Sequence, residues 1–257
     1  MLIPVVDVRF VPALVRACGF EPVFGSKILT ALRAYGICDP RARFWVQTEA
    51  EGETAALYLS GDVLVISAAE CAGAADVADL VRAESVREVD TNWAQCAALQ
   101  QLLGGTTESS YYMVYTGGAV EGDFRAMRRG ELEKVFGVLQ RSHEYYRTHL
   151  NFDSWSADLR QKLERGLMEL YQLTVNGEVI GTGSIASEDD GNACIVAVAV
   201  VPEHRHQGWG SYISRFLVQR IQEKGKTPRL ISGYDEVAEL YRKIGFEACG
   251  RWGELYL

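Results

Sequence analysis

The sequence predicts an α/β protein made of two similar halves. Short apolar runs alternate with stretches in which apolar residues recur every three or four positions, the pattern of strands alternating with amphipathic helices. The hydrophobic content of 48% and the charged content of 23% are those of a globular chain with a packed core. The second half shows the order of elements clearly and the first half repeats it weakly, so we place their junction in residues 104–118, GGTTESSYYMVYTGG.

Residues after the junction carry the stronger pattern. Leu132, Val135, Phe136 and Leu139 recur at helical spacing and mark one buried helix face. Asn176-Gly177 predicts the turn of a hairpin over 168–187. The other expected elements are a short strand at the start of 124–146, a helix over 154–167 capped by Ser154 or Ser156, a strand over 192–201 buried on both faces, a helix over 208–224, a strand over 228–233, a helix from 235 that ends at Gly245, and a strand over 250–257.

The first half repeats this plan. Aligning LQQLLGG (99–105) with LYRKIGF (240–246) matches leucines and terminal glycines, which supports an internal repeat. The expected elements are a helix over 26–35, strands over 43–48, 55–60 and 63–68, a helix over 73–83, a strand over 86–91 and a helix over 93–105.

Charge and cysteine content exclude several classes of protein. The net charge of −8 argues against a nucleic-acid binder, because phosphate contacts need clustered Lys and Arg. No run approaches the roughly 20 apolar residues of a membrane span, and the N-terminal MLIPVVDVRF is too short and too charged for a signal peptide. The six cysteines lie far apart without a C-x-x-C pair, so we expect free thiols in a cytoplasmic protein.

The most informative stretch is IVAVAVVPEHRHQGWGSY, residues 195–212. It leads from an apolar strand into a helix through R-x-x-G-x-G, formed by Arg205, Gly208 and Gly210. The first turn of a helix has unpaired N–H groups and the positive end of the dipole, and glycines let the backbone approach an anion closely. No Lys-Ser or Lys-Thr follows, and position 213 is isoleucine, so neither a P-loop nor a dinucleotide fingerprint is present. A diphosphate remains the expected ligand, but the loop belongs to another family of binding proteins.

These residues resemble those of a known family. VVPEHRHQGWG is similar to the coenzyme A pyrophosphate loop of the GCN5-related N-acetyltransferases, the GNAT superfamily, and AELYRKIGFE resembles the later helix of that family. The two motifs occur in the family's order, about 30 residues apart. The resemblance implies a mixed, mostly antiparallel sheet flanked by helices, with two tandem GNAT-like halves and one active site. It assigns residues 1–110 to a degenerate domain and 111–257 to a catalytic one. Where the family usually has asparagine before the later helix, this chain has Asp235.

The resemblance also implies roles for individual residues. Acetyl-CoA, or another acyl-CoA, is the implied co-substrate, and Tyr241 is the implied hydrogen-bond donor to the departing thiolate. Gln100 occupies the matching position of the first half and cannot act as an acid. The implied coenzyme contacts are the backbone of Val198, Ala199 and Val200 along the pantetheine arm, and Arg205 with the N–H groups of His206, Gln207, Gly208, Trp209, Gly210 and Ser211 at the pyrophosphate.

The acceptor site is predicted less closely. The aromatic segment HEYYRTHLNFDSW (143–155) stands where such folds form the acceptor pocket, and Glu144, Tyr145 and Tyr146 are expected to shape acceptor choice. Glu144, His143 and Glu188 are alternative general bases. No metal site is expected, since His204 and His206 lack a partner cluster.

The sequence thus predicts an N-acyltransferase acting on an amine of a small molecule or peptide. The alternative is a coenzyme A-binding sensor or scaffold without turnover. Neither nucleic acid nor membrane is expected as a partner, and the chain is expected to be a monomer or homodimer.

Overall fold

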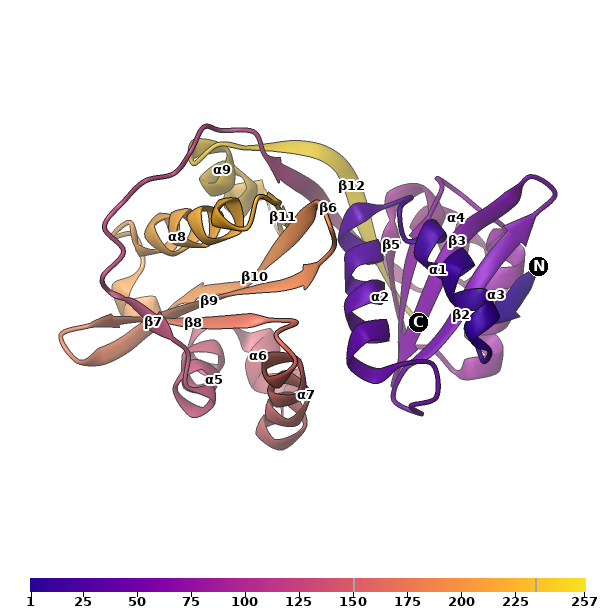
Figure 1. Cartoon of the computed structure of the whole chain (residues 1–257), viewed down its shortest axis with the longest axis horizontal. Helices are drawn as coiled ribbons and strands as arrows, with labels where there is room; N and C mark the ends of the chain where they lie inside the picture. The colour runs from indigo at the N-terminus through magenta and orange to yellow at the C-terminus, as the bar shows by residue number, and fades with distance from the viewer. Residues whose placement is uncertain (150, 234) are drawn as a thin grey trace. The chain divides into compact units, whose positions relative to one another are not determined.

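The structure, a computed structural model, describes residues 1–149, 151–233 and 235–257 of the chain, without the side chains of Tyr145 and His149 (Figure 1). The chain forms two compact units. Unit 1 comprises residues 1–113, 231–238 and 248–257, and unit 2 comprises residues 114–230 and 239–247.

Unit 1 is a sheet with helices on both faces. Its strand order is β1-β2-β3-β4-β5-β12-β6. The β4–β5 pair is parallel, whereas β1–β2, β2–β3, β3–β4 and β5–β12 are antiparallel. The elements are β1 (Leu2–Pro4), η1 (Val8–Phe10), α1 (Val11–Ala17), α2 (Pro22–Tyr35), β2 (Arg43–Glu49), β3 (Gly52–Ser60), β4 (Val63–Ala68), α3 (Ala74–Glu84), β5 (Glu88–Asn92), α4 (Trp93–Leu103), β6 (Thr106–Tyr115) and β12 (Phe246–Tyr256).

Alternation along the strands separates the two faces of unit 1. Leu64 and Ile66 of β4 pack in one apolar core with α3 and α4. Ser67, which follows Ile66, turns to the opposite face, where its hydroxyl accepts a hydrogen bond from the N–H of Glu21 at the start of α2. Alternate residues of the strands therefore point to the face of the sheet that is covered by α2.

Unit 2 has the same layered construction. Its strand order is β11-β10-β9-β8-β7, and in Figure 1 α8 lies on one face of the sheet and α5, α6 and α7 on the other. The elements are β7 (Met127–Arg129), α5 (Leu132–Ser142), α6 (Glu144–His149), α7 (Phe152–Glu164), β8 (Glu169–Val175), β9 (Glu178–Glu188), β10 (Asn192–Val200), η2 (Pro202–His204), α8 (Trp209–Glu223) and β11 (Thr227–Ile231). Helix α9 (Asp235–Lys243) has its first four residues in unit 1 and the rest in unit 2.

Two glycines let α8 approach the sheet of unit 2. A Cβ at Gly181 would lie 2.9 Å from Ile213 Cδ1, and one at Gly183 would lie 2.7 Å from Ile213 Cγ2 and 2.8 Å from Leu217 Cδ1. Ile213 and Leu217 are fully buried. The bare backbone of β9 thus sets the distance between the sheet and the helix that follows the glycine-containing loop.

Most of the expected elements are confirmed within a few residues. Asn176 and Gly177 form the hairpin turn with φ of +51° and +84°. The expected cap of α7 is wrong: Asn151, three residues before Ser154, accepts from the N–H groups of Asp153 and Ser154. The segment 104–118, expected to be the junction, is largely strand β6; its first half is polar, so the alternation of apolar and polar residues typical of a strand is not visible there. The sequence pattern also does not predict β1, α1 and α6, because each is short. None of the described helices is both long and apolar enough to cross a bilayer.

We predict opposite effects for two glycine-to-alanine substitutions. Gly183→Ala forces a methyl group against two side chains of α8, so the free energy of unfolding should fall by about 1–3 kcal/mol. Gly137→Ala adds a methyl group within α5 where none of the described residues lies within 4 Å, so it should gain about 0.5–1 kcal/mol from helix propensity. Urea denaturation of both variants measures the difference, and equal effects would contradict the close packing of α8.

Candidate functional site

Strand β10 leaves its neighbour β11 partway along its length. The two strands pair in parallel over Asn192–Cys194, whereas β10 stays paired with β9 as far as Val200 opposite Gly181. Beyond Cys194, the described residues show no further pairing of β10 with β11. A strand edge with unpaired N–H and C=O groups can accept an extended ligand as an added strand.

A bulge accompanies this separation. The register with β9 shifts between Val196 and Ala199, and Ala197 has φ of +54°. The expectation that 192–201 is buried on both faces is wrong for the part after Ile195, where Val196 is 37% exposed and the next four residues are half-buried. The reason is the loss of the β11 neighbour. An apolar strand with an exposed centre is unusual for structure alone and is typical of a binding site.

The loop after β10 presents the start of α8. His206 and Gly208 both have positive φ, +61° and +85°, and Gly208 is the residue before the helix. No side chain of the described residues caps α8, whose first backbone bond joins the N–H of Tyr212 to the C=O of Gly208. The N–H groups that open the helix therefore remain available, together with the positive end of its dipole. These features are those of an anion site at a helix N-terminus.

Arg205 ties this loop to a neighbouring helix. Its Nε donates to the C=O of Val200 at 3.2 Å, and its Nη2 donates to the C=O of Ser142 at the end of α5. A cation at the carbonyl end of a helix is electrostatically favourable. The structure thus gives Arg205 a role in holding the loop, and its direct contact with a pyrophosphate stays a prediction.

Tyr241 lies in a nearly closed environment. It is 7% exposed, and its ring packs edge-on against Phe246 with 5.6 Å between centroids. Burial raises the pKa of Tyr241 to about 12, although a hydrogen bond with the Ser214 hydroxyl works in the opposite direction. Ser214 is fully buried on α8 and donates to the C=O of Gly210 at 2.8 Å. The tyrosine is therefore a neutral donor, connected through Ser214 to the first turn of α8.

Tyr146 is brought beside the same region. Like Ala197 and Ala199 of β10, it packs against the buried cluster that contains Leu139. Its hydroxyl is near enough to Tyr241 to contribute to the raised pKa of Tyr241. The sequence therefore pointed to three features that the structure brings together in unit 2: Tyr146, Tyr241 and the bulged strand.

The remaining acceptor residues are less closely defined. Glu144 is exposed at the first residue of α6, and the ring of His143 lies 6.3 Å from that of Tyr146. The side chain of Tyr145 lies outside the described part of the structure. Glu144 and His143 thus lie beside Tyr146 in the chain, and their role as a base stays a prediction.

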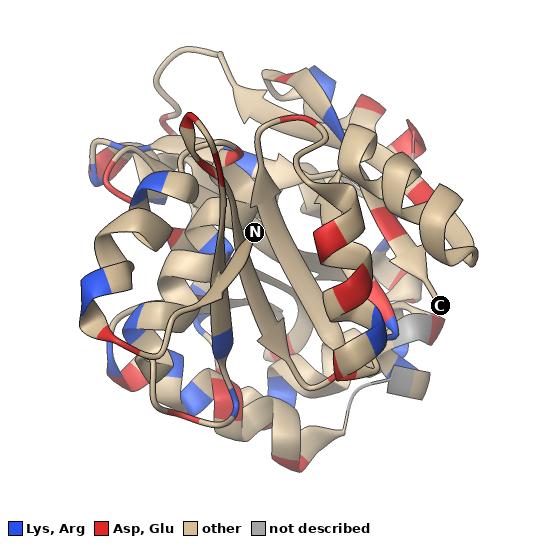
Figure 2. Ribbon diagram, turned by 90° about the vertical axis from the view of Figure 1, so that its right-hand side faces the viewer, with Lys and Arg blue, Asp and Glu red and all other residues tan. Residues whose placement is uncertain are grey.

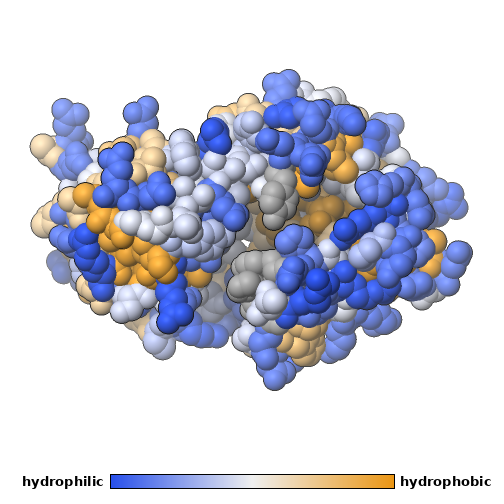
Figure 3. Space-filling view, turned by 180° about the vertical axis from the view of Figure 1, so that it is seen from behind, coloured by the Kyte–Doolittle hydropathy of each residue, from blue (hydrophilic) through white to orange (hydrophobic). Residues whose placement is uncertain are grey.

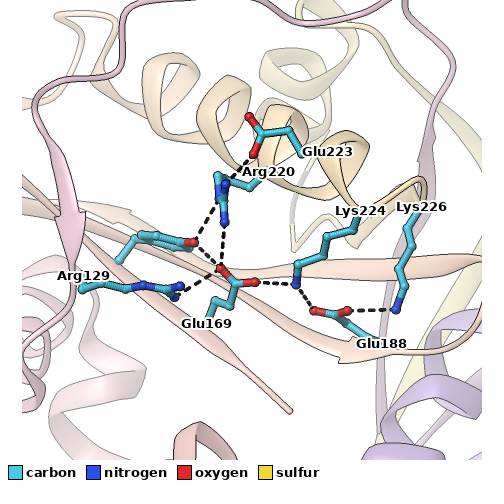
Figure 4. A network of polar contacts seen from close by, with 8 residues as sticks. Arg129, Glu169, Glu188, Arg220, Glu223, Lys224 and Lys226 are labelled. Atoms are coloured by element: carbon cyan, nitrogen blue, oxygen red, sulfur yellow. Dashed lines mark hydrogen bonds and ion pairs between the residues drawn. The ribbon is translucent and has the colours of Figure 1, made fainter. Parts of the chain in front are cut away.

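Glu188 belongs instead to an ion-pair network at the far end of α8 (Figure 4). Its carboxylate pairs with Lys224 at 2.5 Å and with Lys226 at 2.9 Å. Burial raises the pKa of Glu188, but the hydrogen bonds and charges of these lysines outweigh it, so the pKa is lowered. Glu169, the other central acid, contacts Arg129, Tyr171, Arg220 and Lys224.

This network joins the start of β8 and the end of β9 to the last turn of α8. Cations in the last turn of a helix also favour its negative end. The sequence interpretation of Glu188 as a possible base overlooked these lysines, which come 36 and 38 residues later. Its charge is committed to fixing the helix, so it is the weakest of the three candidate bases.

Side chains fill the corresponding junction of unit 1. The amide of Gln47 donates to the C=O of Gly73 before α3, and a Cβ at Gly73 would overlap Gln47 Nε2. Asn92 donates from β5 to the C=O groups of Ala68 and Glu70 after β4, at 3.2 and 2.9 Å. The start of α3 has no side-chain cap from the described residues, as in α8, but here side chains from β2 and β5 occupy the junction and bind its C=O groups.

Comparison with known proteins agrees with this geometry. Residues 168–248 match the family model described as an acetyltransferase (GNAT) domain. No protein with a curated description matches the chain. Similar solved structures include a GCN5-related N-acetyltransferase from Kribbella flavida (15% identity, TM-score 0.63, covering 93% of this chain and 95% of that one) and a GNAT-family acetyltransferase from Colwellia psychrerythraea (12%, 0.63, 100% and 99%). A tandem GNAT protein from the clavulanic acid biosynthesis pathway is also similar (12%, 0.59, 99% and 97%).

These findings define the class of protein. The chain has the fold of GNAT acetyltransferases, including a tandem GNAT protein, and its residues 168–248 match the model of a GNAT acetyltransferase domain. The predicted resemblance and the predicted mixed, mostly antiparallel α/β fold are therefore confirmed.

We predict that the two loop glycines differ in their need for glycine. Gly208 has φ of +85°, and a Cβ added there would meet none of the described residues within 4 Å, whereas a Cβ at Gly210 would make an ordinary contact with Leu240 at 3.6 Å. Gly208→Ala should lower the free energy of unfolding by about 1–2 kcal/mol through backbone strain, and Gly210→Ala should lower it by less than half as much. Chemical denaturation tests this, and an equal loss in both variants would show that sterics rather than φ governs the loop.

Proposed function

We propose that this protein is an N-acyltransferase that moves an acetyl group from acetyl-CoA to an amine of a small molecule or peptide. The observation that carries the proposal is the strand β10, which separates from β11 at a bulge and leads directly into the uncapped N-terminus of α8. An extended thioester with a diphosphate at one end matches this combination of a free strand edge and an anion site.

The coenzyme is proposed to bind in two parts. The N–H groups of residues 206–211 hold the pyrophosphate, and Arg205 keeps their loop in place against α5. The backbone of Val198–Val200 pairs with the pantetheine arm, which brings the thioester toward the bulge at Ala197. A backbone N–H at the bulge then supports the negative oxygen of the tetrahedral intermediate.

The chemistry requires one proton donor and one proton acceptor. The amine nitrogen forms a bond with the acyl carbon, the C–S bond breaks, and the proton released by the amine balances the thiolate that leaves. With its pKa raised to about 12, Tyr241 could transfer its proton fully to a thiolate of pKa about 8.5 only at a cost of roughly 5 kcal/mol. Tyr241 therefore donates a hydrogen bond to the developing charge, and Glu144 or His143 is the base.

One active site for the whole chain is part of the proposal. Residues 111–257 carry the reaction, and residues 1–110 are a degenerate relative whose junction is filled by Gln47 and Asn92. Gln100, at the position matching Tyr241, offers an amide and no phenolic proton.

The distribution of charge on the surface and the free cysteines are compatible with a small-molecule or peptide acceptor. In the view of Figure 2, acidic and basic residues are interspersed and no helix is uniformly basic, and the face in Figure 3 is mostly hydrophilic with separate apolar patches. None of the six cysteines, all of which belong to the described residues, forms a disulfide. We therefore propose a cytoplasmic enzyme, monomeric or homodimeric, that does not act on nucleic acid or membrane.

We predict that Tyr241→Phe lowers kcat for thiol release from acetyl-CoA about 100-fold or more, as expected when a positioned hydrogen-bond donor to developing charge is removed, with little change in KM for the coenzyme. Tyr115→Phe is the matched control, since Tyr115 packs edge-on against the same Phe246 at 5.3 Å and its hydroxyl donates to the C=O of Gly118. A panel of amines, aminoglycosides and peptides serves as acceptors. Tight coenzyme binding without thiol release on any acceptor would favour the sensor instead.

We predict a pH signature for Tyr241 as well. Because burial raises its pKa from 10 to about 12, the unfolded chain loses this proton first, and stability falls as pH rises from about 10 toward 12, by about 2–3 kcal/mol in full. The tyrosine stays a donor throughout the range below pH 10. An ultraviolet difference titration of the wild type against Tyr241→Phe measures it, and ionisation of Tyr241 near pH 10 would contradict the buried environment.

A further inference from the structure

A cluster of carboxylates lies in unit 1, apart from the elements proposed for acyl transfer. Glu88 and Asp90 come from β5, and Glu254 comes from β12, where it stands directly opposite Asp90. One oxygen from each of the three lies within 4.8 Å of the others. Val89 and Leu255 pack in the core under α3 and α4, so the alternate residues Glu88, Asp90 and Glu254 face α2.

This arrangement concentrates negative charge. Like charges directly opposite on paired strands are destabilising. Lys27 of α2 contacts Asp90 Oδ2 at 2.8 Å and offsets one of the three carboxylates, and Tyr256 donates a hydrogen bond to Glu254 Oε2 at 2.8 Å without adding charge. Burial, followed by the charge of Asp90, raises the pKa of Glu254 to about 7, so this carboxyl takes up its negative charge only at the cost of repulsion within the cluster.

A buried oxygen within the cluster also lacks a donor. Asp90 is 6% exposed, and its Oδ1, the oxygen not used by Lys27, is buried without a hydrogen-bond partner among the described residues. A buried charged oxygen with no partner costs free energy, and native proteins rarely retain one unless a ligand, ion or water satisfies it. A bound cation would both coordinate the unsatisfied Oδ1 of Asp90 and offset the concentrated negative charge.

We propose that Glu88, Asp90 and Glu254 bind a hard divalent cation, Mg²⁺ or Ca²⁺, on the α2 face of unit 1. The ligand set consists of carboxylate oxygens, which suit these ions rather than softer metals. The charge of +2 offsets the repulsion among these carboxylates, and water completes the coordination. The cation joins β5 to β12 and so fastens the C-terminal strand into the sheet of unit 1.

The test uses the full-length protein, stripped with EDTA and dialysed at pH 8. MgCl2 or CaCl2 is added to roughly 10 mM, which exceeds the Kd of about 1 mM that is typical of weak protein calcium sites. Either salt should raise Tm by about 2–4 °C. Glu254→Gln should be at least as stable as the wild type without cation, because a repulsion is removed, and should not respond to either salt. Asp79→Asn, which removes an exposed carboxylate from α3 of the same unit, should respond like the wild type.

A second measurement does not depend on stability. Tb³⁺ bound at the cluster should show tyrosine-sensitised luminescence, since Tyr256 contacts the ligand Glu254, and excess Ca²⁺ should quench it. Glu88→Gln, at a half-buried position, is a second ligand variant in case Glu254→Gln does not fold, and it should lose at least tenfold in Tb³⁺ affinity. Stability that depends on pH but on neither cation, or a Tm shift and luminescence unchanged in both ligand variants, overturns the proposal.

Discussion

The site of this protein depends on how the N-terminus of α8 is held open. A helix in a folded protein usually has its first N–H groups satisfied by a capping side chain, yet α8 begins after Gly208 with no cap from the described residues. The helix is fixed at its other end instead, where Glu169 and Glu188 bind the cations of its last turn and of the following residues. The buried contact with Gly181 and Gly183 fixes its middle. The N–H groups at the start of α8 are therefore presented by a rigid helix.

Strand β10, which leads to the loop before α8, likewise has backbone groups that are left without a partner in the sheet among the described residues. β10 could have stayed paired with β11 and satisfied its backbone, but it separates after Cys194 and bulges at Ala197. Available backbone groups on the strand and on the helix thus follow one another along the chain. Tyr241 and Tyr146 approach from α9 and α6, both with their rings largely packed against apolar neighbours. The polar groups of the candidate site therefore stand in apolar surroundings, which strengthen the hydrogen bonds that they make.

The sequence predicted the elements of unit 2 well because glycine and apolar spacing act locally. The Asn176-Gly177 turn, the strand before Pro202 and the helix after Gly208 could all be derived from neighbouring residues. Interactions between distant segments could not. The role of Arg205 depends on a carbonyl 63 residues away at Ser142, and the lysines that commit Glu188 come from another part of the chain. The partial exposure of β10 also escaped prediction, because an apolar run does not reveal where a neighbouring strand turns aside.

Strand β12 belongs to both units, so the two units are not successive segments of the chain. Phe246 and Glu247 belong to unit 2, and residues 252–256 pair with β5 in unit 1. The polypeptide therefore passes from unit 1 into unit 2 after residue 113 and returns to unit 1 twice, over residues 231–238 and 248–257. A single cut near residue 113 cannot release two whole domains, because the N-terminal piece would lack the strand beside β5 and expose that edge to aggregation. Unit 1 is completed only when residues 248–257 have been synthesised, so neither unit can be exchanged for a foreign domain by simple fusion at a linker.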